Sequence, residues 1–167
     1  MVTLNLAYTA PINPSGATPT LTPAQVWAGL QRKVRRAQDF VPIIEACTVV
    51  SEETVANTGN LKVVREVRFA AGSEPAGGAL VREACIHLAP CRVDFEQPDG
   101  SSISNIVSRG PDGALLMTYA FEWRYPGVEE GSAEAQALEE RSWKTAKMAV
   151  HGSIDTIRRL VRDSEIQ

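Results

Sequence analysis

The last third of the chain constrains the fold most, because a strongly alternating segment leads directly into one long amphipathic segment. Residues 115–125 place their apolar and aromatic side chains on one parity: Leu115, Met117, Tyr119, Phe121, Trp123 and Tyr125. The other parity is largely polar, so a strand here buries only one of its faces. After a Pro-Gly break, the apolar periodicity predicts a helix from about Ser132 to Arg162. Together the two segments predict a curved antiparallel sheet closed by the terminal helix, with room for a ligand between them.

The preceding segments supply the rest of this sheet. Alternation predicts a first strand within residues 1–10. A helix then begins at Thr22, where Thr22 can cap, Pro23 fits the first helical position and Gln25 can complete a capping box. Further strands are predicted near residues 45–55, 61–70, 80–89, 92–97, 102–109 and 114–125, separated by turns that include one from Gly72 to Gly78. Strands that follow one another without intervening helices favour antiparallel pairing. The sequence therefore predicts an α+β fold of about seven strands, with residues 1–167 forming a single domain.

Composition excludes several classes of function. A net charge of -3 gives no basic surface for nucleic acid, and the basic run Arg32, Lys33, Arg35 and Arg36 is interpreted as a solvated helix face. The three cysteines and two histidines show no metal-ligand spacing, so we expect reduced thiols and no metal site.

The alternating N-terminus predicts no signal peptide, and no segment is long enough to span a membrane. We expect a cytoplasmic protein whose partner is a small hydrophobic or aromatic molecule; the sequence leaves open whether it forms a homodimer.

The order of the predicted elements resembles the helix-grip architecture of the START-like superfamily, also called SRPBCC. Four stretches resemble more closely a small family named after the acetylaranotin biosynthesis cluster protein L: Val64-Arg65-Glu66, Arg92-Val93-Asp94-Phe95, residues 103–108 and residues 121–127. That family occurs in fungi and some bacteria and is associated in part with secondary-metabolite clusters. The resemblance implies a fold and a metabolic setting, but it carries no catalytic residue set to transfer.

Two arginines stand out as candidate site residues. The sequence has no phosphate-binding loop, dinucleotide fingerprint or nucleophile elbow, so we expect any activity to come from polar groups in an apolar pocket, without a cofactor. Arg65 and Arg82 each share a parity with apolar neighbours in their predicted strands. Either guanidinium could bind an enolate, phenolate or carboxylate. The alternatives are a structural salt bridge, or a bulge that turns Glu66 and Glu83 inward instead.

Uncharged residues are also expected to face the pocket. Asn105 and Tyr119 lie on the apolar parities of their strands, where each could hydrogen-bond a ligand or satisfy a buried backbone group. Met117, Phe121 and Trp123 share the parity of Tyr119 and are expected to contact a ligand.

The terminal helix contributes two charged candidates. Its apolar stripe is formed by Trp143, Ala146, Val150, Ile154, Ile157 and Val161. Glu139 and Lys147 fall on the same stripe, one turn on either side of Trp143. If the helix crosses the pocket there, a carboxylate in an apolar site has a raised pKa and can serve as an acid or base. Otherwise both charges are solvated where the helix leaves the sheet.

Three functions are consistent with this pattern. The first is a cofactor-independent cyclase, isomerase or dehydratase for a polyketide-like or aromatic intermediate, in which Arg65 stabilises an anion, Glu139 transfers a proton and Tyr119 orients the substrate. Trp143, Lys147, Arg82 and Asn105 would then bind the ligand. The second is a non-catalytic carrier of a lipid or metabolite. The third is a protein-interaction module, which would need a large exposed apolar patch. The metabolic setting favours the first.

Overall fold

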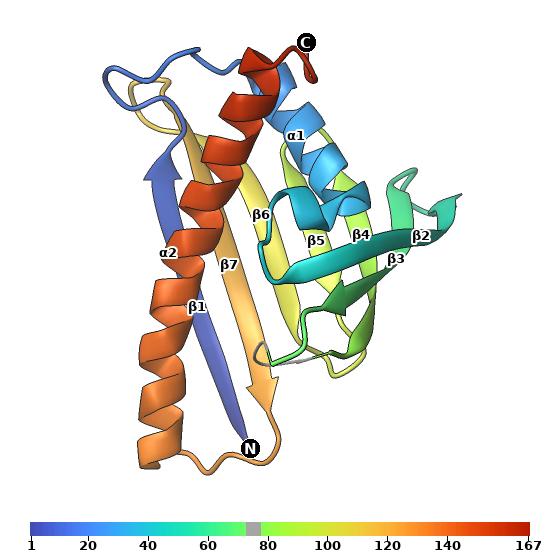
Figure 1. The fold of residues 1–167 in the computed structure, drawn as a ribbon, viewed down its shortest axis with the longest axis vertical. Coiled ribbons are helices and arrows are strands. Elements are labelled where there is room, and N and C mark those ends of the chain that lie inside the picture. Colours follow the sequence, from blue (N-terminus) through green and yellow to red (C-terminus); the bar gives the residue numbers. More distant parts are fainter. Residues whose placement is uncertain (73–77) are drawn as a thin grey trace.

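A computed structural model of the chain describes residues 1–72 and 78–167 (Figure 1). Its elements follow in the order β1 (Val2–Pro11), α1 (Pro23–Arg35), the 3-10 helix η1 (Ala37–Asp39), β2 (Ile44–Thr54), β3 (Leu61–Phe69), β4 (Leu80–Leu88), β5 (Arg92–Glu96), β6 (Ser102–Arg109), β7 (Leu115–Tyr125) and α2 (Ala133–Arg162). The predicted strands, the start of α1 and both ends of α2 agree with these bounds to within about two residues. The turn predicted from Gly72 to Gly78 falls mainly on residues 73–77, which lie outside the described residues.

One antiparallel sheet contains all seven strands in the order β1-β7-β6-β5-β4-β3-β2. The first strand therefore pairs with the last, and β2 lies at the opposite edge. Register shifts in β2, at Ile44/Ala46 and at Val49/Ser51, bend this edge strand, as β-bulges do. The result confirms the predicted α+β fold: an antiparallel sheet with a long C-terminal helix.

The two helices cover one face of the sheet. Helix α2 runs along β1 and β7, while α1 lies beside the C-terminal half of α2, over the middle strands (Figure 1). The main core is the layer between them and the inner face of the sheet, and it includes Val26, Leu30, Val63, Tyr119, Val150 and Ile157. Below, "inner face" means the face of the sheet that the two helices cover.

Local sequence explains where the helices begin and how closely they approach. The predicted capping box is confirmed: the backbone N–H of Gln25 donates to the hydroxyl of Thr22, and the N–H of Thr22 donates to the side chain of Gln25. Gly29 of α1 faces Ile157 of α2, and a Cβ at position 29 would lie 2.6 Å from Cδ1 of Ile157. The missing side chain therefore allows the two helices to pack against one another.

The buried face of α2 differs from the predicted stripe. The helix buries Ala135, Ser142, Ala146, Val150, Ser153, Ile154, Ile157 and Leu160. Trp143 is 45% exposed, and Glu139 and Lys147 are exposed as well. The prediction was wrong in the first half of the helix, where Ser142 is buried and Trp143 is not, because an apolar pattern does not count a buried serine. In this half of the helix the buried row contains Ser142, and the predicted row through Trp143 lies beside it.

Candidate functional site

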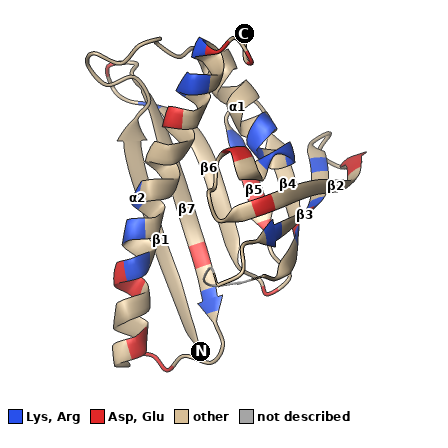
Figure 2. Cartoon of the chain, viewed as in Figure 1, with Lys and Arg blue, Asp and Glu red and all other residues tan. Residues whose placement is uncertain are grey.

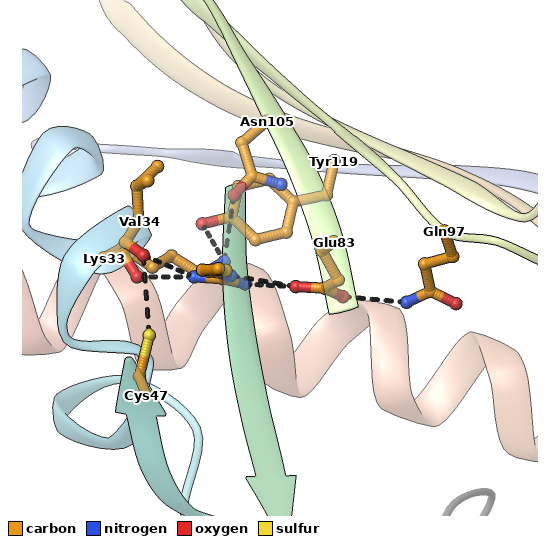
Figure 3. Close-up of polar contacts among 8 residues, drawn as sticks. Lys33, Val34, Cys47, Glu83, Gln97, Asn105 and Tyr119 are labelled. Atoms are coloured by element: carbon orange, nitrogen blue, oxygen red, sulfur yellow. Dashed lines mark hydrogen bonds and ion pairs between the residues drawn. The ribbon is translucent and has the colours of Figure 1, made fainter. Parts of the chain in front are cut away.

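Side chains from five elements converge on the inner face in a buried group of polar residues. We call it the polar cluster, and its members are Lys33, Arg65, Glu83, Gln97, Asn105 and Tyr119. The Nζ of Lys33 donates to Oδ1 of Asn105 at 2.9 Å and to the hydroxyl of Tyr119 at 3.1 Å (Figure 3). Asn105 and Tyr119 are direct neighbours across β6 and β7, which brings both side chains to the same point. The predicted inward orientation of these two residues is confirmed.

Lys33 corrects the interpretation of the basic run as a solvated face. It is 8% exposed, whereas Arg32 and Arg36 pair with Asp39 near the surface. The helical spacing carried the signal, because position 33 follows Leu30 by three residues and so lies on the apolar stripe of α1. A lysine in such a position extends its aliphatic stem through the core and needs partners for its amine. We missed this residue because it was grouped with its charged neighbours.

Arg65 and Glu83 form a buried ion pair at the other side of the cluster. Nε and Nη2 of Arg65 both donate to Oε2 of Glu83, at 2.9 Å and 2.7 Å. Nη1 of Arg65 donates to the backbone carbonyls of Lys33 and Val34 at the end of α1, at 2.9 Å and 3.0 Å. Arg65 therefore faces inward as predicted, but its guanidinium ties β3 to β4 and to α1. This is the salt-bridge alternative that the sequence left open.

Arg82 faces outward, so the predicted parity of β4 was wrong. Arg65 lies opposite Glu83, and Glu66 lies opposite Arg82, in an unbroken register between β3 and β4. Residues opposite one another share a face, so an inward Arg65 requires an inward Glu83 and an outward Arg82. The side chain of Arg82 is 60% exposed and pairs with Glu66 at 2.6 Å. Two opposite-charge pairs in one hairpin register were the signal that could have settled this parity.

The protonation states of the cluster follow from its burial. Burial lowers the pKa of Lys33 to about 7, the charge of Arg65 adds to this effect, and Glu83 partly opposes it. Burial also acts to lower the pKa of Arg65, but the carboxylate of Glu83 raises it above its ordinary value, so the guanidinium stays charged. Burial raises the pKa of the Tyr119 phenol, so it stays protonated. Lys33 therefore changes charge near neutral pH.

Asn105 holds a hydrogen-bond donor without a partner. The residue is fully buried, and among the described residues no acceptor lies within hydrogen-bonding distance of its Nδ2. Lys33 donates to the oxygen of this amide, so the atom left without a partner is the nitrogen. An unmet buried donor costs about 1–3 kcal/mol, so its presence in the core indicates a place for an acceptor.

An aromatic row along β7 leads to this cluster. Tyr119 is 1% exposed and Phe121 is 6% exposed, while Trp123 is only partly buried. The ring centroids of Tyr119 and Phe121 are 6.3 Å apart, and those of Phe121 and Trp123 are 4.5 Å apart. Met117, fully buried, continues the inner face on the other side of Tyr119. The predicted orientation of Met117, Phe121 and Trp123 is thus confirmed, and their contact with a ligand stays a prediction.

The first half of α2 does not join the polar cluster. Glu139 and Trp143 line a surface groove of about 300 Å³ with residues 3–6 of β1. Acidic and basic side chains are distributed along this half of the helix (Figure 2), where Lys147 is also exposed. Arg82 lines a second groove of about 300 Å³ with outward residues of β3, β4 and β5, and two members of the polar cluster, Glu83 and Gln97, also line it. The structure therefore brings Arg65, Asn105 and Tyr119 together and leaves Glu139, Lys147, Trp143 and Arg82 outside.

The antiparallel seven-stranded sheet and the long C-terminal helix place the chain in the class of helix-grip folds. Two aromatase/cyclases share its fold. With Zhui from Streptomyces sp. R1128 the TM-score is 0.58 at 15% identity, covering 99% of this chain and 100% of that one. With the di-domain ARO/CYC StfQ from the steffimycin biosynthetic pathway the TM-score is 0.63 at 12% identity, and the match covers 98% of this chain. The chain spans about half, 52%, of that di-domain chain.

Sequence comparison identifies the family within this class. The family described as "Acetylaranotin biosynthesis cluster protein L" matches residues 6–164. The protein of that name from Aspergillus terreus is 31% identical over 157 residues, covering 94% of this chain and 89% of the relative. The chain belongs to this family. In the part that the structure describes, no helix has the length and apolar character needed to cross a membrane.

Proposed function

We propose that the chain binds a hydrophobic secondary-metabolite intermediate on the inner face and catalyses a cofactor-independent cyclisation, isomerisation or dehydration of it. The observation that supports this most directly is the unmet amide donor of Asn105, placed beside an amine that titrates near neutral pH. The aromatic row supplies an apolar surface that leads from the partly exposed Trp123 to these groups. Reactions of this kind need orientation, one acid–base group and one oxyanion donor.

The polar cluster suggests a division of roles. The Nδ2 of Asn105 would donate to a carbonyl or enolate oxygen, and Lys33 would exchange a proton with the substrate. Tyr119 would orient the substrate through a phenol that stays protonated. Arg65 would act as a positioning residue, because its hydrogen bonds are directed to Glu83 and to the end of α1. Glu139 receives no role, because it lies in the groove beside β1.

The names of the relatives support the metabolic setting. The Aspergillus terreus relative takes its name from a biosynthesis cluster, and the solved structures with this fold include two aromatase/cyclases, one of them from the steffimycin biosynthetic pathway. Identity to those solved structures is 12–15%, so they support the fold, and the reaction assigned here is our inference.

A non-catalytic carrier is the second candidate. Its specific support is that the one buried arginine of the cluster is engaged by Glu83, which leaves fewer groups to drive a reaction. Both functions use the same face, so an assay of turnover distinguishes them, whereas an assay of binding does not.

Denaturing extraction of freshly purified protein, followed by mass spectrometry, tests the proposal. A stoichiometric aromatic or polyketide-like compound is expected, and it is then added back to assay its conversion. Tyr119→Phe should lower turnover at least tenfold while binding persists. Thr118→Val removes a hydroxyl from the adjacent residue of β7, which bonds to Thr9 on the outer side, and should change neither. A bound compound that is never converted would favour the carrier. Turnover unaffected by Tyr119→Phe would contradict the proposed site.

A further inference from the structure

We propose that Lys33 is a nucleophile that condenses reversibly with a ketone or aldehyde carbonyl of the ligand and holds it as an imine. This inference rests on the proposed function, because it uses the same inner face. It adds a ligand class, carbonyl compounds and above all 1,3-dicarbonyl compounds, and it gives the amine a covalent role.

The hydrogen bonds of Lys33 are those of a neutral amine. A neutral amine has two N–H donors and one lone pair, whereas an ammonium group has three donors. The described residues offer Nζ two oxygen acceptors, Oδ1 of Asn105 at 2.9 Å and the hydroxyl of Tyr119 at 3.1 Å. These two acceptors satisfy both donors of a neutral amine and leave its lone pair free to attack a carbonyl carbon.

The surroundings of Lys33 favour the uncharged state. The titratable groups that face it are Arg65 from β3, Glu83 and Cys85 from β4, and Tyr119 from β7. Both Nε and Nη2 of Arg65 donate to Glu83, so this carboxylate is already paired and only partly opposes the lowering of the Lys33 pKa by burial and by Arg65. Two aromatic rings lie near Nζ, with the ring centroid of Tyr119 at 4.3 Å and that of Phe95 at 5.7 Å; these contacts favour a charged amine and act against the larger effect of burial. A pKa of about 7 for Lys33 agrees with this geometry.

The groups needed for imine formation are next to the amine. The lone pair of Nζ attacks the carbonyl carbon, and the electrons of the C=O bond move to the oxygen, which accepts a hydrogen bond from Nδ2 of Asn105. A proton lost by the nitrogen reaches that oxygen through the phenol of Tyr119, which gives a carbinolamine. A second proton transfer expels water and forms the C=N bond. The balance is amine plus carbonyl to imine plus water, and hydrolysis reverses it without an oxidant or reductant.

The sequence provides internal controls, because the chain has four lysines. Lys62 pairs with Glu53 at 3.0 Å, and Lys144 and Lys147 are exposed on α2. Amines in water stay protonated at pH 7 and react slowly. Selective reaction at position 33 would therefore report the buried environment and not general reactivity of lysine.

Acetylacetone is the probe, because a neutral lysine amine converts a 1,3-diketone into an enaminone that absorbs in the near ultraviolet. The full-length protein is incubated with it between pH 5 and 9, and the adduct is located by intact mass and peptide mapping. One adduct on Lys33, with a rate that rises through a midpoint near pH 7, is expected. Lys33→Met should abolish it, and Tyr119→Phe should slow it at least tenfold.

Two results would overturn the inference, and both are read from the wild-type protein, so they do not depend on the folding of a variant. One is an adduct spread over Lys62, Lys144, Lys147 and the N-terminus without preference for Lys33. The other is no adduct at Lys33. In the second case native mass spectrometry separates the two proposals: acetylacetone or the extracted compound bound without a covalent link leaves the proposed function standing, whereas no binding counts against both.

Discussion

Replacing Arg65 with methionine should destabilise the protein far more than the same change at Arg82. Arg65→Met leaves the Glu83 carboxylate buried without its partner, and the carbonyls of Lys33 and Val34 lose their donor. Removing one member of a buried ion pair costs about 3–5 kcal/mol. Arg82 and Glu66 form a pair in the adjacent register position on the outer face, where the side chain of Arg82 is 60% exposed. Loss of such an exposed pair costs less than about 1 kcal/mol.

Urea denaturation followed by circular dichroism measures both changes. With an m-value of about 2 kcal/mol/M, Arg65→Met should lower the midpoint by roughly 1.5–2.5 M, and Arg82→Met by less than about 0.5 M. The double change Arg65→Met with Glu83→Met should recover part of the loss, because it removes both charges together. Equal losses for Arg65→Met and Arg82→Met, or a double variant no more stable than Arg65→Met, would refute this reasoning.

Three further predictions concern pH, capping and packing. The folded pKa of Lys33 is about 7 and its ordinary value is 10.5, so the unfolded chain binds more protons between these values. Stability relative to Lys33→Met should therefore rise with pH across that window and level off below it; a flat difference in urea midpoints from pH 7 to 10 would count against this. Thr22→Ala should cost about 1 kcal/mol by removing the cap of α1, and a thermal melt unchanged from wild type would contradict that role. Gly29→Ala should cost about 1–3 kcal/mol because its Cβ meets Ile157, and Ile157→Val should restore part of this; no rescue in the double variant would place the clash elsewhere.

The fold was predictable because its signals are local and periodic. Alternation located β7, the capping residues located the start of α1, and the order of elements gave the antiparallel sheet closed by a terminal helix. These signals depend on which residues are apolar, and most of the core is apolar.

The candidate site was harder to predict because it consists of the exceptions to that pattern. Lys33, Glu83 and Ser142 are polar residues at buried positions, which a pattern of apolar residues does not count. The alternation within one strand does not show which of its faces is buried when a buried residue is polar. The pairing between strands does show it, because the register that places Arg65 opposite Glu83 fixes both faces of the hairpin at once. Asn105 and Tyr119 were found because they interrupt clear apolar parities.

Side-chain amide signals of Asn105 in two-dimensional NMR test the central claim, that the inner face holds a ligand at the polar cluster. The protein is titrated with 2,4-dihydroxyacetophenone, an aromatic ketone, and Asn57 in the exposed turn between β2 and β3 serves as the control. We predict that the Nδ2 signal of Asn105 shifts on binding, because its unmet donor gains an acceptor, while Asn57 does not change. An unchanged Asn105 signal at a ketone concentration that saturates the shifts of other residues would contradict the account.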